Sequence, residues 1–512
     1  MHRLTNTREV ERAARRLTAL LEARPEWLLR EGRAGACVEL RRGEWELTSA
    51  TGLLRLSYWG EAGARTWRVV AFGSEGEKIL LAARGPVGSV GVTLELVPRA
   101  SVSAARAELS EARRAACERL AALVRREERA EVLRLRLSDG PRRGEPGRYM
   151  RAVLLRRPDG ARLAATGPVV PLGAEEADAF LTSALLWHAR LEERAEGGSP
   201  TSLLLVAPRA LAPATGERLA LLNPRLRARV SLLEVDEELT CLTRVPVPSL
   251  EELLDSAPPR LPRPQDASPS ALAAAVVSLA PDAVDVVRAR RGETLRFRGL
   301  AFARVRRVLG SENLWFGTAA SKRLLDEESR PDFLKLLEDL KEHRRHDAPD
   351  PRHALYRAAP EAWLESLLRR DITRLDPGLR LAPLHAQFRT TRAAAPSARP
   401  VDLLALRRDG RLAVVELKAS EDAAHPLQGA DYWRRLEAHR RAGNLARARL
   451  FGDTELSDSP PLLYLAAPAL RFHRSLDTLT RALAPQIEIY RYDLNEDWRS
   501  GVRVARRGRV GV

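Results

Sequence analysis

The sequence predicts an α/β protein with several domains. Helix-like and strand-like segments alternate along the chain, and two apolar strand-like segments flank an Asp-Gly turn within residues 399–433. The chain has 512 residues, which exceeds the size of one ordinary hydrophobic core. We therefore expect about two to four domains, in which sheets are covered by helices.

The first half divides into two expected regions. Residues 1–100 should form an N-terminal helix followed by a β-rich module, and residues 101–255 should form an α/β domain. The expected helices of this half cover residues 8–24, 102–130 and 175–194. The expected strands lie between residues 37 and 97 and at residues 132–137, 150–156, 202–207 and 229–234.

A Pro- and Ala-rich segment separates the two halves. Ser256 to Ala271 has the composition of a linker, and we assign residues 256–283 to it. The predicted order of helices and strands in the first half is then repeated in the second half. Residues 284–345 should form a second β-rich module with a helix, and residues 346–512 a second α/β domain.

Four short segments of the first half resemble segments of the second half in the same order. The offsets between matching segments lie between 244 and 259 residues. Such similar offsets favour an internal duplication, with chance matches between short Arg-rich patterns as the alternative. The matching segments begin at Val38 and Val287, Phe72 and Phe316, Leu154 and Leu404, and Leu203 and Leu462.

The formal charge of +17 favours a polyanionic partner, because clustered cations release the counterions condensed on phosphate backbones. A composition rich in Arg and Ala is the alternative explanation of this charge. Only five of the 85 basic residues are lysines. A retained lysine such as Lys418 therefore suggests a site that needs a compact charge rather than a planar guanidinium.

Cysteine usage and the start of the chain indicate a cytoplasmic protein. Cys37, Cys117 and Cys241 lie far apart without metal-ligand spacing, which suggests a reducing compartment and no disulfide framework. The N-terminal segment lacks the apolar core of a signal peptide. The longest apolar run, at residues 271–280, has about half the length of a membrane span, so we expect no membrane partner.

The hairpin of residues 399–418 carries the most chemical information. Strand alternation puts Glu416 and Lys418 on one face of its second strand. A two-residue turn would leave Asp402 and Glu416 on opposite faces of the sheet. A three-residue loop that ends at Gly410 in the left-handed conformation would instead set Asp402 directly opposite Glu416. We favour this second register because it forms one acidic site.

Two carboxylates and an ammonium group on one apolar face are costly to bury unless a further charge joins them. A hard divalent cation with oxygen ligands, Mg²⁺ or Mn²⁺, would compensate Asp402 and Glu416. Such a cation lowers the pKa of a bound water, and Lys418 could stabilise the charge that develops on a phosphate. A salt bridge along the strand between Glu416 and Lys418 is the alternative.

These residues resemble the PD-(D/E)XK nuclease superfamily. Asp402 matches the acid of its first motif, with Pro400 displaced by one position, and residues 416–418 match its E-x-K element. The resemblance covers residues 354–498. It implies a restriction-endonuclease-like mixed sheet flanked by helices, in which Asp402, Glu416 and Lys418 are catalytic.

A predicted helix upstream of the hairpin strengthens this resemblance. The helix begins at Pro360 and carries Glu365 on its apolar stripe. The superfamily has a glutamate on such a helix as an additional metal ligand, so the expected metal ligands are Glu365, Asp402 and Glu416. Glu361, one turn earlier, is the alternative on this helix, although a charge at a helix N-terminus explains it as well.

A predicted helix downstream adds a second motif. Gln428 and Tyr432 lie at i and i+4, and hence on one face of that helix. Their spacing resembles the Q-x-x-x-Y motif of RecB-type and CRISPR-associated exonucleases. The resemblance implies that both side chains bind the substrate strand near the scissile phosphate.

Other candidate chemistries find little support. The chain has no P-loop or dinucleotide fingerprint, because the GSEGEK segment at Gly73 lacks the length and the Ser/Thr of a P-loop. His343 and His346 are assigned to a solvated loop rather than to a zinc site. His425 follows the E-x-K strand, and we expect a structural or solvent-exposed role for it.

If the chain arose by duplication, we expect the first half to lack the metal-binding site of the second half. Under the duplication, the counterparts of the three catalytic candidates are Arg151, Gly167 and Val169, so no metal ligand is retained and residues 101–255 should be a degenerate nuclease-like copy. The two β-rich modules could grip nucleic acid through aromatic side chains, with positions in the hydrophobic core as the alternative. The aromatic candidates are Trp45, Tyr58, Trp59, Trp67 and Trp315.

We therefore expect a Mg²⁺- or Mn²⁺-dependent nuclease that hydrolyses phosphodiester bonds of DNA, in defence or repair. DNA is favoured over RNA as the nucleic-acid partner. The alternatives are a catalytically silent nucleic-acid-binding protein that retains the nuclease fold and an RNA-directed nuclease. The sequence is compatible with a homo-oligomer as well as with a monomer.

Overall fold

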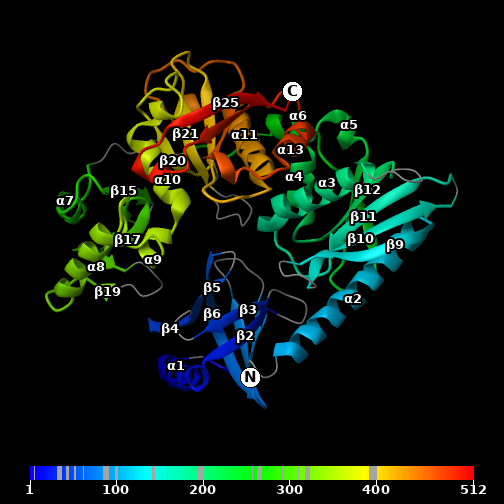
Figure 1. Cartoon of the computed structure of the whole chain (residues 1–512), viewed down its shortest axis with the longest axis horizontal. Coiled ribbons are helices and arrows are strands. Elements are labelled where there is room, and N and C mark those ends of the chain that lie inside the picture. The colour runs from blue at the N-terminus through cyan, green and yellow to red at the C-terminus, as the bar shows by residue number, and fades with distance from the viewer. Residues whose placement is uncertain are drawn as a thin grey trace. The chain divides into compact units, whose positions relative to one another are not determined.

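The computed structural model of the chain (Figure 1) forms two compact units. The first unit comprises Met1–Gly173, Leu191–Ala212 and Ser231–Val245, and the second comprises Ala174–Arg190, Pro213–Val230 and Pro246–Val512. The structure describes all residues except 5, 32–36, 42–44, 51–52, 61–62, 85–90, 99–101, 141–144, 158, 194–199, 257, 262–267, 290–291, 309–310, 318–322, 391–399 and 512.

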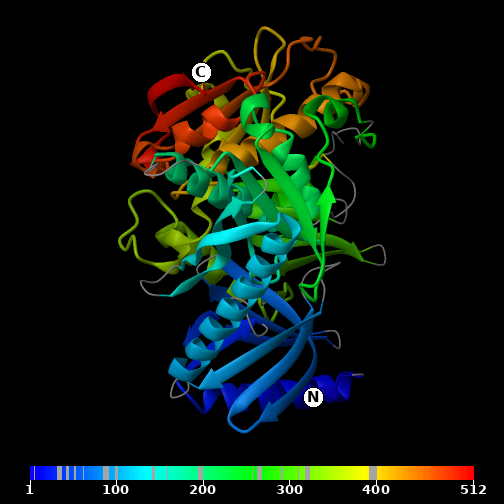
Figure 2. The same cartoon turned by 90° about the vertical axis from the view of Figure 1, so that its right-hand side faces the viewer.

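The first unit begins with helix α1 (Thr7–Glu22) and an antiparallel sheet of eight strands. Asn6 caps α1 by accepting a hydrogen bond from the backbone N–H of Glu9, and the buried stripe of α1 packs on one face of the sheet (Figure 2). The strand order is β3-β2-β8-β7-β6-β5-β4, with β1 paired to β6. The strands are β1 (His2–Arg3), β2 (Glu26–Glu31), β3 (Cys37–Arg41), β4 (Trp45–Ala50), β5 (Leu53–Gly60), β6 (Gly63–Glu75), β7 (Lys78–Arg84) and β8 (Gly91–Pro98).

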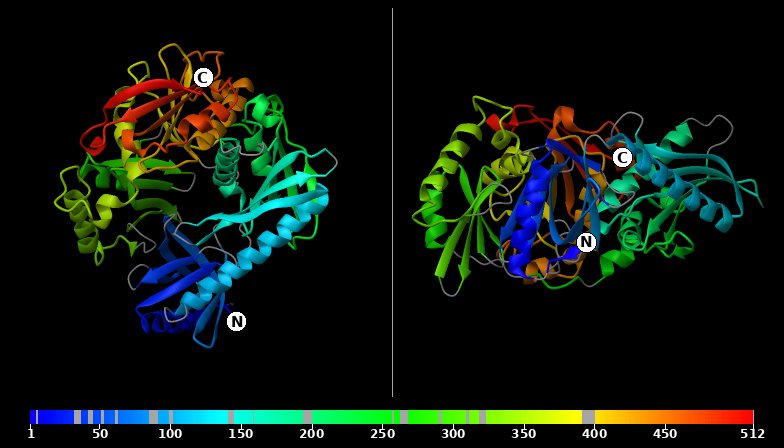
Figure 3. Two further views of the ribbon diagram at one scale, coloured as in Figure 1. Left: turned by 45° about the vertical axis from the view of Figure 1, so that its right-hand side comes forward. Right: turned by 90° about the horizontal axis from the view of Figure 1, so that it is seen from below.

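A second sheet of six strands follows helix α2 (Val102–Glu127), which runs along β9 and β10 (Figure 3). Its order, β14-β13-β12-β11-β10-β9, follows the chain. The strands are β9 (Ala130–Asp139), β10 (Pro146–Arg156), β11 (Arg162–Pro168), β12 (Ser202–Pro208), β13 (Val230–Val235) and β14 (Leu242–Val245). The intervening helices are α3 (Ala177–Glu193), α4 (Ala212–Leu219) and α5 (Pro224–Arg227).

The second unit contains a five-stranded antiparallel sheet in which each strand pairs with the next. Phe302 on this sheet stacks on Phe333 of α8, so the helix covers the apolar face of the sheet. The strands are β15 (Val284–Ala289), β16 (Gly292–Phe297), β17 (Leu300–Val308), β18 (Ser311–Phe316) and β19 (Arg323–Leu324). The helices before and after the sheet are α6 (Leu250–Asp255), α7 (Ala271–Ser278), α8 (Arg330–His343) and α9 (Ala354–Arg357).

The fourth sheet has six strands in the order β20-β21-β22-β23-β24-β25 and is mixed, because β22, β23 and β24 are parallel while the outer pairs are antiparallel. The strands are β20 (His385–Phe388), β21 (Val401–Leu406), β22 (Leu412–Leu417), β23 (Leu462–Pro468), β24 (Ile489–Leu494) and β25 (Val504–Val510). Its helices are α10 (Pro360–Arg370), α11 (His425–Arg441), α12 (Asn444–Arg447) and α13 (Leu476–Ala482).

Helices α10 and α11 both pack on this fourth sheet. Trp363 and Leu368 of α10 share a core with Val415 of β22. Helix α11 contacts β22 and β23, and a Cβ atom at Gly429 would lie 2.9 Å from the side chain of Leu465. The expected α/β architecture, with a mixed sheet flanked by helices, is therefore confirmed for residues 360–510.

The second and fourth sheets share one strand order. In each, the first two pairs are antiparallel, the third pair is parallel and the last is antiparallel, and a long helix (α3 or α11) connects the third strand to the fourth. The strand order expected of a repeat is therefore present. The common origin of the two halves by duplication stays a prediction.

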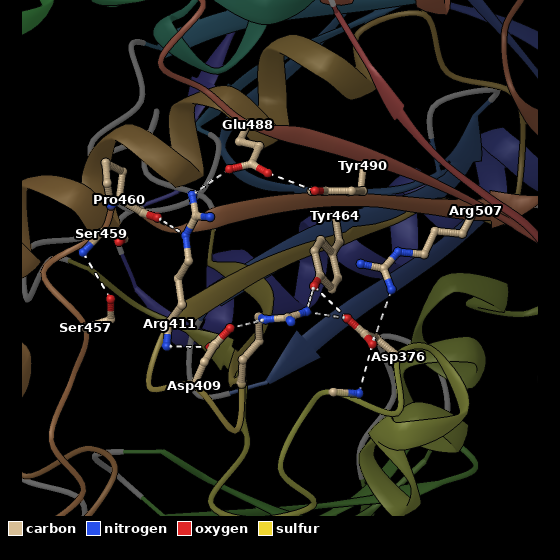
Figure 4. Close-up of polar contacts among 12 residues, drawn as sticks. Asp376, Asp409, Arg411, Ser457, Ser459, Pro460, Tyr464, Glu488, Tyr490 and Arg507 are labelled. Atoms are coloured by element: carbon tan, nitrogen blue, oxygen red, sulfur yellow. Dashed lines mark hydrogen bonds and ion pairs between the residues drawn. The ribbon is translucent and has the colours of Figure 1, made fainter.

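A buried aspartate fixes the turn end of the β21–β22 hairpin (Figure 4). The Asp376 carboxylate accepts hydrogen bonds from the backbone N–H of Gly378 at 2.9 Å and from the Tyr464 hydroxyl at 2.7 Å, and it lies 2.9 Å from the Arg407 guanidinium. Although burial acts to raise it, these contacts hold the pKa of Asp376 below its ordinary value. The network joins the loop before β20 to β21 and β23.

In the described part of the chain, no helix is both long enough and apolar enough to cross a membrane.

Candidate functional site

The β21–β22 hairpin has the register that forms a single acidic site. Leu403 pairs with Val415, and the ladder ends in a loop in which the Arg407 N–H donates to the Arg411 carbonyl at 2.9 Å. Gly410 in this loop has φ +80°, the left-handed conformation that glycine adopts without strain. The predicted three-residue loop is confirmed, and continuation of the ladder by one residue sets position 402 opposite position 416.

The two carboxylates of this pair interact in a buried environment. The Asp402 carboxylate accepts a hydrogen bond from the Leu417 N–H at 2.9 Å, yet burial raises the pKa of Asp402 to about 6. Glu416 is fully buried, and burial together with the Asp402 charge raises its pKa well above the ordinary value. Within the described residues, neither oxygen of Glu416 accepts a well-formed hydrogen bond. The pair is therefore short of positive charge.

Lys418 supplies one compensating charge. Its Nζ atom lies 3.1 Å from Glu416 Oε1 and 3.5 Å from an oxygen of the partly exposed Asp422. Although burial acts to lower it, the charges of Glu416 and Glu361 raise the pKa of Lys418 above its ordinary value. The lysine is therefore an ammonium at neutral pH.

The Q-x-x-x-Y residues are connected to this lysine. Lys418 Nζ donates to Gln428 Oε1 at 2.9 Å, and Gln428 Nε2 donates to the Tyr432 hydroxyl at 2.8 Å. Both side chains are buried. Their expected place on one face of α11 is confirmed, and the hydrogen-bond chain orients the ammonium group. Contact with a substrate strand stays a prediction.

An ionic cluster anchors α11 and thereby the face that carries Gln428. Asp431 is buried and pairs with Arg218 at 3.0 Å, Arg434 at 2.7 Å and Arg435 at 3.1 Å. Although burial acts to raise it, the three arginines hold the pKa of Asp431 far below its ordinary value. Since Asp431 is the neighbour of Tyr432, the cluster limits rotation and sliding of the helix at the site.

Helix α10 brings two further carboxylates to the site. It begins at Pro360, preceded by Ala359 in the left-handed conformation, and Glu365 is buried as predicted. Both oxygens of Glu365 have partners, because Oε1 lies 3.0 Å from Arg296 Nη2 and Oε2 accepts from Gln387 Nε2 at 2.7 Å.

A cavity of about 300 Å³ lies beside these carboxylates. Glu361, the alternative on the helix, faces this cavity together with Glu365 and Asp402 and contributes to the raised pKa of Lys418. No hydrogen bond or ion pair joins Glu361 to another of the described residues, which leaves its carboxylate available. The cavity is lined by Ala359, Pro360, Glu361, Ala362, Glu365, Gln387 and Asp402.

The donor set suits a hard cation, with one restriction. Among the described residues, no three Asp, Glu, His or Cys side chains are already arranged around one point as metal ligands. Both oxygens of Glu365 are engaged by Arg296 and Gln387. Buried Glu416, which pairs with Lys418 but accepts no well-formed hydrogen bond among the described residues, nevertheless fits a divalent ion that prefers oxygen ligands, as do the raised pKa of Asp402 and the acidic cavity.

Two residues at the site were missed by sequence reasoning. Arg296 comes from β16, and Gln387 comes from β20, where it also lies 3.4 Å from Asp402 Oδ1. The only unusual local feature is the φ of +49° at Gln387, which no sequence pattern indicates. Arg296 is 69 residues from Glu365, and Gln387 is 15 residues from Asp402.

The histidines do not contribute ligands. His425 is buried, contacts the Glu416 carbonyl at 3.2 Å and stacks on Phe472, and burial lowers its pKa to about 3. It is a neutral structural residue, as expected. His343 stacks on His353, and His346 is exposed, which agrees with a solvated segment.

The first half has other residues at the corresponding positions. In the β10–β11 ladder, Arg151 pairs with Thr166 and Met150 pairs with Gly167. Arg151 is buried, and the Thr166 hydroxyl donates to the Met150 carbonyl at 2.7 Å. The counterparts predicted from the duplication, Arg151 and Gly167, are therefore not directly opposite each other, and neither is acidic.

The aromatic candidates of the first β-rich module belong largely to its core. Tyr58 is fully buried and accepts a hydrogen bond from Trp67 Nε1 at 3.1 Å, so it offers no stacking surface. Trp45 and Trp67 pack against the same core. The side chain of Trp59 lies outside the described residues.

No protein-family model, no curated protein and no solved structure matches this chain.

Proposed function

We propose that residues 346–512 carry a Mg²⁺- or Mn²⁺-dependent nuclease that hydrolyses phosphodiester bonds of DNA. The observation that carries this proposal is the buried Asp402–Glu416 pair, which has Lys418 as its nearest cation and an acidic cavity beside it. Burial of uncompensated carboxylates is costly, so such a pair is typical of a binding site rather than of a structural core.

The metal ligands in this proposal are Asp402, Glu416 and one glutamate of α10. Glu361 suits this role better than Glu365, because the described residues leave its carboxylate without a partner whereas both oxygens of Glu365 are engaged. The bound cation lowers the pKa of a water molecule and offsets the charge of a phosphate group.

The protein's own groups perform the remaining tasks. Lys418, kept protonated by the neighbouring carboxylates and oriented by Gln428, donates a hydrogen bond to a phosphate oxygen as negative charge grows there. Tyr432 holds the amide of Gln428 in the orientation that accepts from the ammonium. The lysine needs this support because an ammonium group on a four-carbon chain is otherwise free to rotate.

DNA is the proposed substrate, with defence or repair as the setting. The formal charge of +17 favours a nucleic acid, and the preference for DNA rests on the resemblance of the motifs alone. The rival proposals are an RNA-directed nuclease and a nucleic-acid-binding protein without turnover. Oligomeric state is left open in all three.

A nuclease assay with one matched control tests this proposal. Supercoiled, linear and single-stranded DNA and RNA are incubated with the full chain in Mg²⁺, Mn²⁺ or EDTA. Glu416→Ala should lower the cleavage rate at least about 100-fold, because several kcal/mol of transition-state stabilisation depend on the ion. Glu421→Ala, an exposed acid three residues beyond Lys418, should cleave like wild type.

The results of this assay distinguish the proposed DNA nuclease from its two rivals. Equal cleavage by wild type and Glu416→Ala places the activity elsewhere and contradicts the site. Binding without cleavage in either metal supports the silent binding protein. Cleavage of RNA alone supports the RNA-directed enzyme.

A further inference from the structure

Arg296 is a cation that a different sheet contributes to the site. It lies on β16 of the five-stranded sheet, and its side chain is nearly inaccessible to solvent. Its Nη2 atom lies 3.0 Å from Glu365 Oε1 and 2.9 Å from an oxygen of Asp285. The guanidinium therefore stands beside a carboxylate that lines the cavity.

Arg296 is held in this position from two sides. Asp285 is its cross-strand neighbour on β15 and pairs with Arg296 and also with Arg369 of α10. Nε and Nη2 of Arg296 both donate to the same oxygen of Asp285, Oδ2, which restricts the orientation of the guanidinium.

The β16–β17 turn is locked against α10. Gly299 in this turn has φ +83°, and a Cβ atom there would lie 1.9 Å from the Ala362 carbonyl oxygen. The fully buried Arg344 donates to the carbonyls of Arg298 and Ala359, which joins the turn to the start of α10. Both features keep β16, and Arg296 with it, next to the helix that carries Glu365.

The charges at the site leave room for one divalent ion. The buried or cavity-lining groups are four carboxylates, Glu361, Glu365, Asp402 and Glu416, and two cations, Arg296 and Lys418, which leaves a formal charge of −2. The partly exposed Asp422, 3.5 Å from Lys418, is screened by solvent and lies outside this balance. Asp285 and Arg369 pair with each other and cancel. One divalent cation neutralises this site, whereas two would leave excess positive charge among buried groups.

The hydrogen bonds of the carboxylate oxygens also favour a single ion. Arg296 and Gln387 occupy both oxygens of Glu365, while both oxygens of Glu416 lack a well-formed hydrogen bond among the described residues. A second ion near α10 would have to displace a guanidinium that Asp285 also holds.

We propose that Arg296 takes the place of a second metal ion beside Glu365, so that the site binds a single divalent cation through Glu361, Asp402 and Glu416. This inference rests on the proposed nuclease function. Glu365 is then a positioning residue that links the metal-binding helix to Arg296, and the five-stranded sheet is part of the site rather than a separate binding module.

Counting bound Mn²⁺ in the full chain, by electron paramagnetic resonance and by calorimetry, tests the proposal without any cleavage readout. Wild type should bind one ion. Arg296→Met, which removes the charge but keeps much of the side-chain volume, should admit a second ion, and Arg296→Met combined with Glu365→Gln should return the count to one. Arg369→Met removes the other cation on Asp285 and should still bind one ion.

Two results overturn the inference. Wild type that binds two ions of similar affinity contradicts it, as does Arg296→Met with the count and affinity of wild type. Wild type that binds no Mn²⁺ at all removes the proposed nuclease function as well, which distinguishes the two failures.

A second pair of variants covers the possibility that Arg296→Met does not fold. In the otherwise native chain, Glu361→Gln should weaken Mn²⁺ binding at least about tenfold, because the loss of a charged ligand costs more than about 1.4 kcal/mol. Glu365→Gln should change the affinity by no more than about threefold. The reverse order of effects identifies Glu365 as the ligand and contradicts the proposal.

Discussion

At the scale of single residues, the site is defined by carboxylates whose ionisation is opposed by their surroundings. Burial raises the pKa of Asp402 to about 6, and burial together with the Asp402 charge raises the pKa of Glu416 well above its ordinary value. The pKa of Lys418 is raised as well, although burial acts to lower it, because Glu416, Glu361 and Asp422 favour the charged ammonium. Perturbed pKa values that cluster in this way are typical of functional sites.

The raised pKa of Asp402 predicts how stability depends on pH. An acid with a higher pKa in the folded than in the unfolded protein stabilises the fold while protonated, and this contribution is lost as pH rises through the folded pKa. In EDTA, unfolding free energy should therefore fall by about 1–3 kcal/mol as pH rises from the ordinary pKa of 3.8 through about 6.

Thermal unfolding at about pH 5 and about pH 7.5, with EDTA or Mn²⁺, measures this effect. The ion competes with protons for the same oxygens, so Mn²⁺ should raise the melting temperature more at the higher pH. Asp402→Asn serves as the control and should reduce both the pH dependence and the effect of Mn²⁺. A metal effect that is equal at both pH values would contradict the assignment of Asp402.

At the scale of elements, the hairpin of β21 and β22 is positioned at both ends. Its loop contains Gly410 in the left-handed conformation, and next to the loop Arg407 pairs with the buried Asp376. At the other end, α10 and α11 bring Glu361 and Gln428 to Asp402 and Lys418. The turn network therefore stabilises the strand register that sets Asp402 opposite Glu416.

Asp376→Asn tests the contribution of this network. The substitution keeps the side-chain shape but removes the charge that Arg407 and the Tyr464 hydroxyl meet, so it should lower the unfolding free energy by about 2–3 kcal/mol at neutral pH. Because the folded pKa of Asp376 is depressed, this difference should shrink as pH falls below about 4.

Asp409→Asn is the matched control for this measurement. Asp409 lies in the β21–β22 loop and pairs with the same Arg407, but its side chain is more than half exposed. Its loss should cost less than about 1 kcal/mol. Equal losses in the two variants, followed by chemical denaturation, would show that the buried position of Asp376 has no special role.

At the scale of the whole molecule, a strongly basic chain carries two six-stranded sheets of the same strand order, and the β21–β22 hairpin of one of them holds the Asp402–Glu416 pair. Under the predicted duplication, the counterparts of Asp402 and Glu416 are Arg151 and Gly167, neither of which is acidic. Binding and cleavage should therefore depend on different residues, with the arginines supplying phosphate contacts and one hairpin supplying chemistry.

DNA binding in EDTA should show this separation. Affinity should fall steeply with salt concentration for wild type and for Glu416→Ala, with equal slopes of log Kd against log salt concentration, because counterion release depends on the number of phosphate contacts. Fluorescence anisotropy at several salt concentrations measures the slopes. A much shallower slope in Glu416→Ala would mean that the variant has lost phosphate contacts as well as the metal site.

The sequence by itself determined the local parts of the site. Alternation along β22 and the loop that ends at Gly410 predict the face shared by Asp402, Glu416 and Lys418, and helical spacing predicts the face shared by Gln428 and Tyr432. These relations depend on backbone geometry over a few residues. The local sequence is therefore sufficient to predict them.

The tertiary structure decided which charges meet at the site. Arg296 is separated from Glu365 by 69 residues and belongs to another sheet, and Gln387 comes from the edge strand β20. No periodicity connects such residues, since their contact arises only when the core between α10 and the sheets forms. The structure therefore distinguishes the engaged Glu365 from the available Glu361, which share one helix and look alike in the sequence.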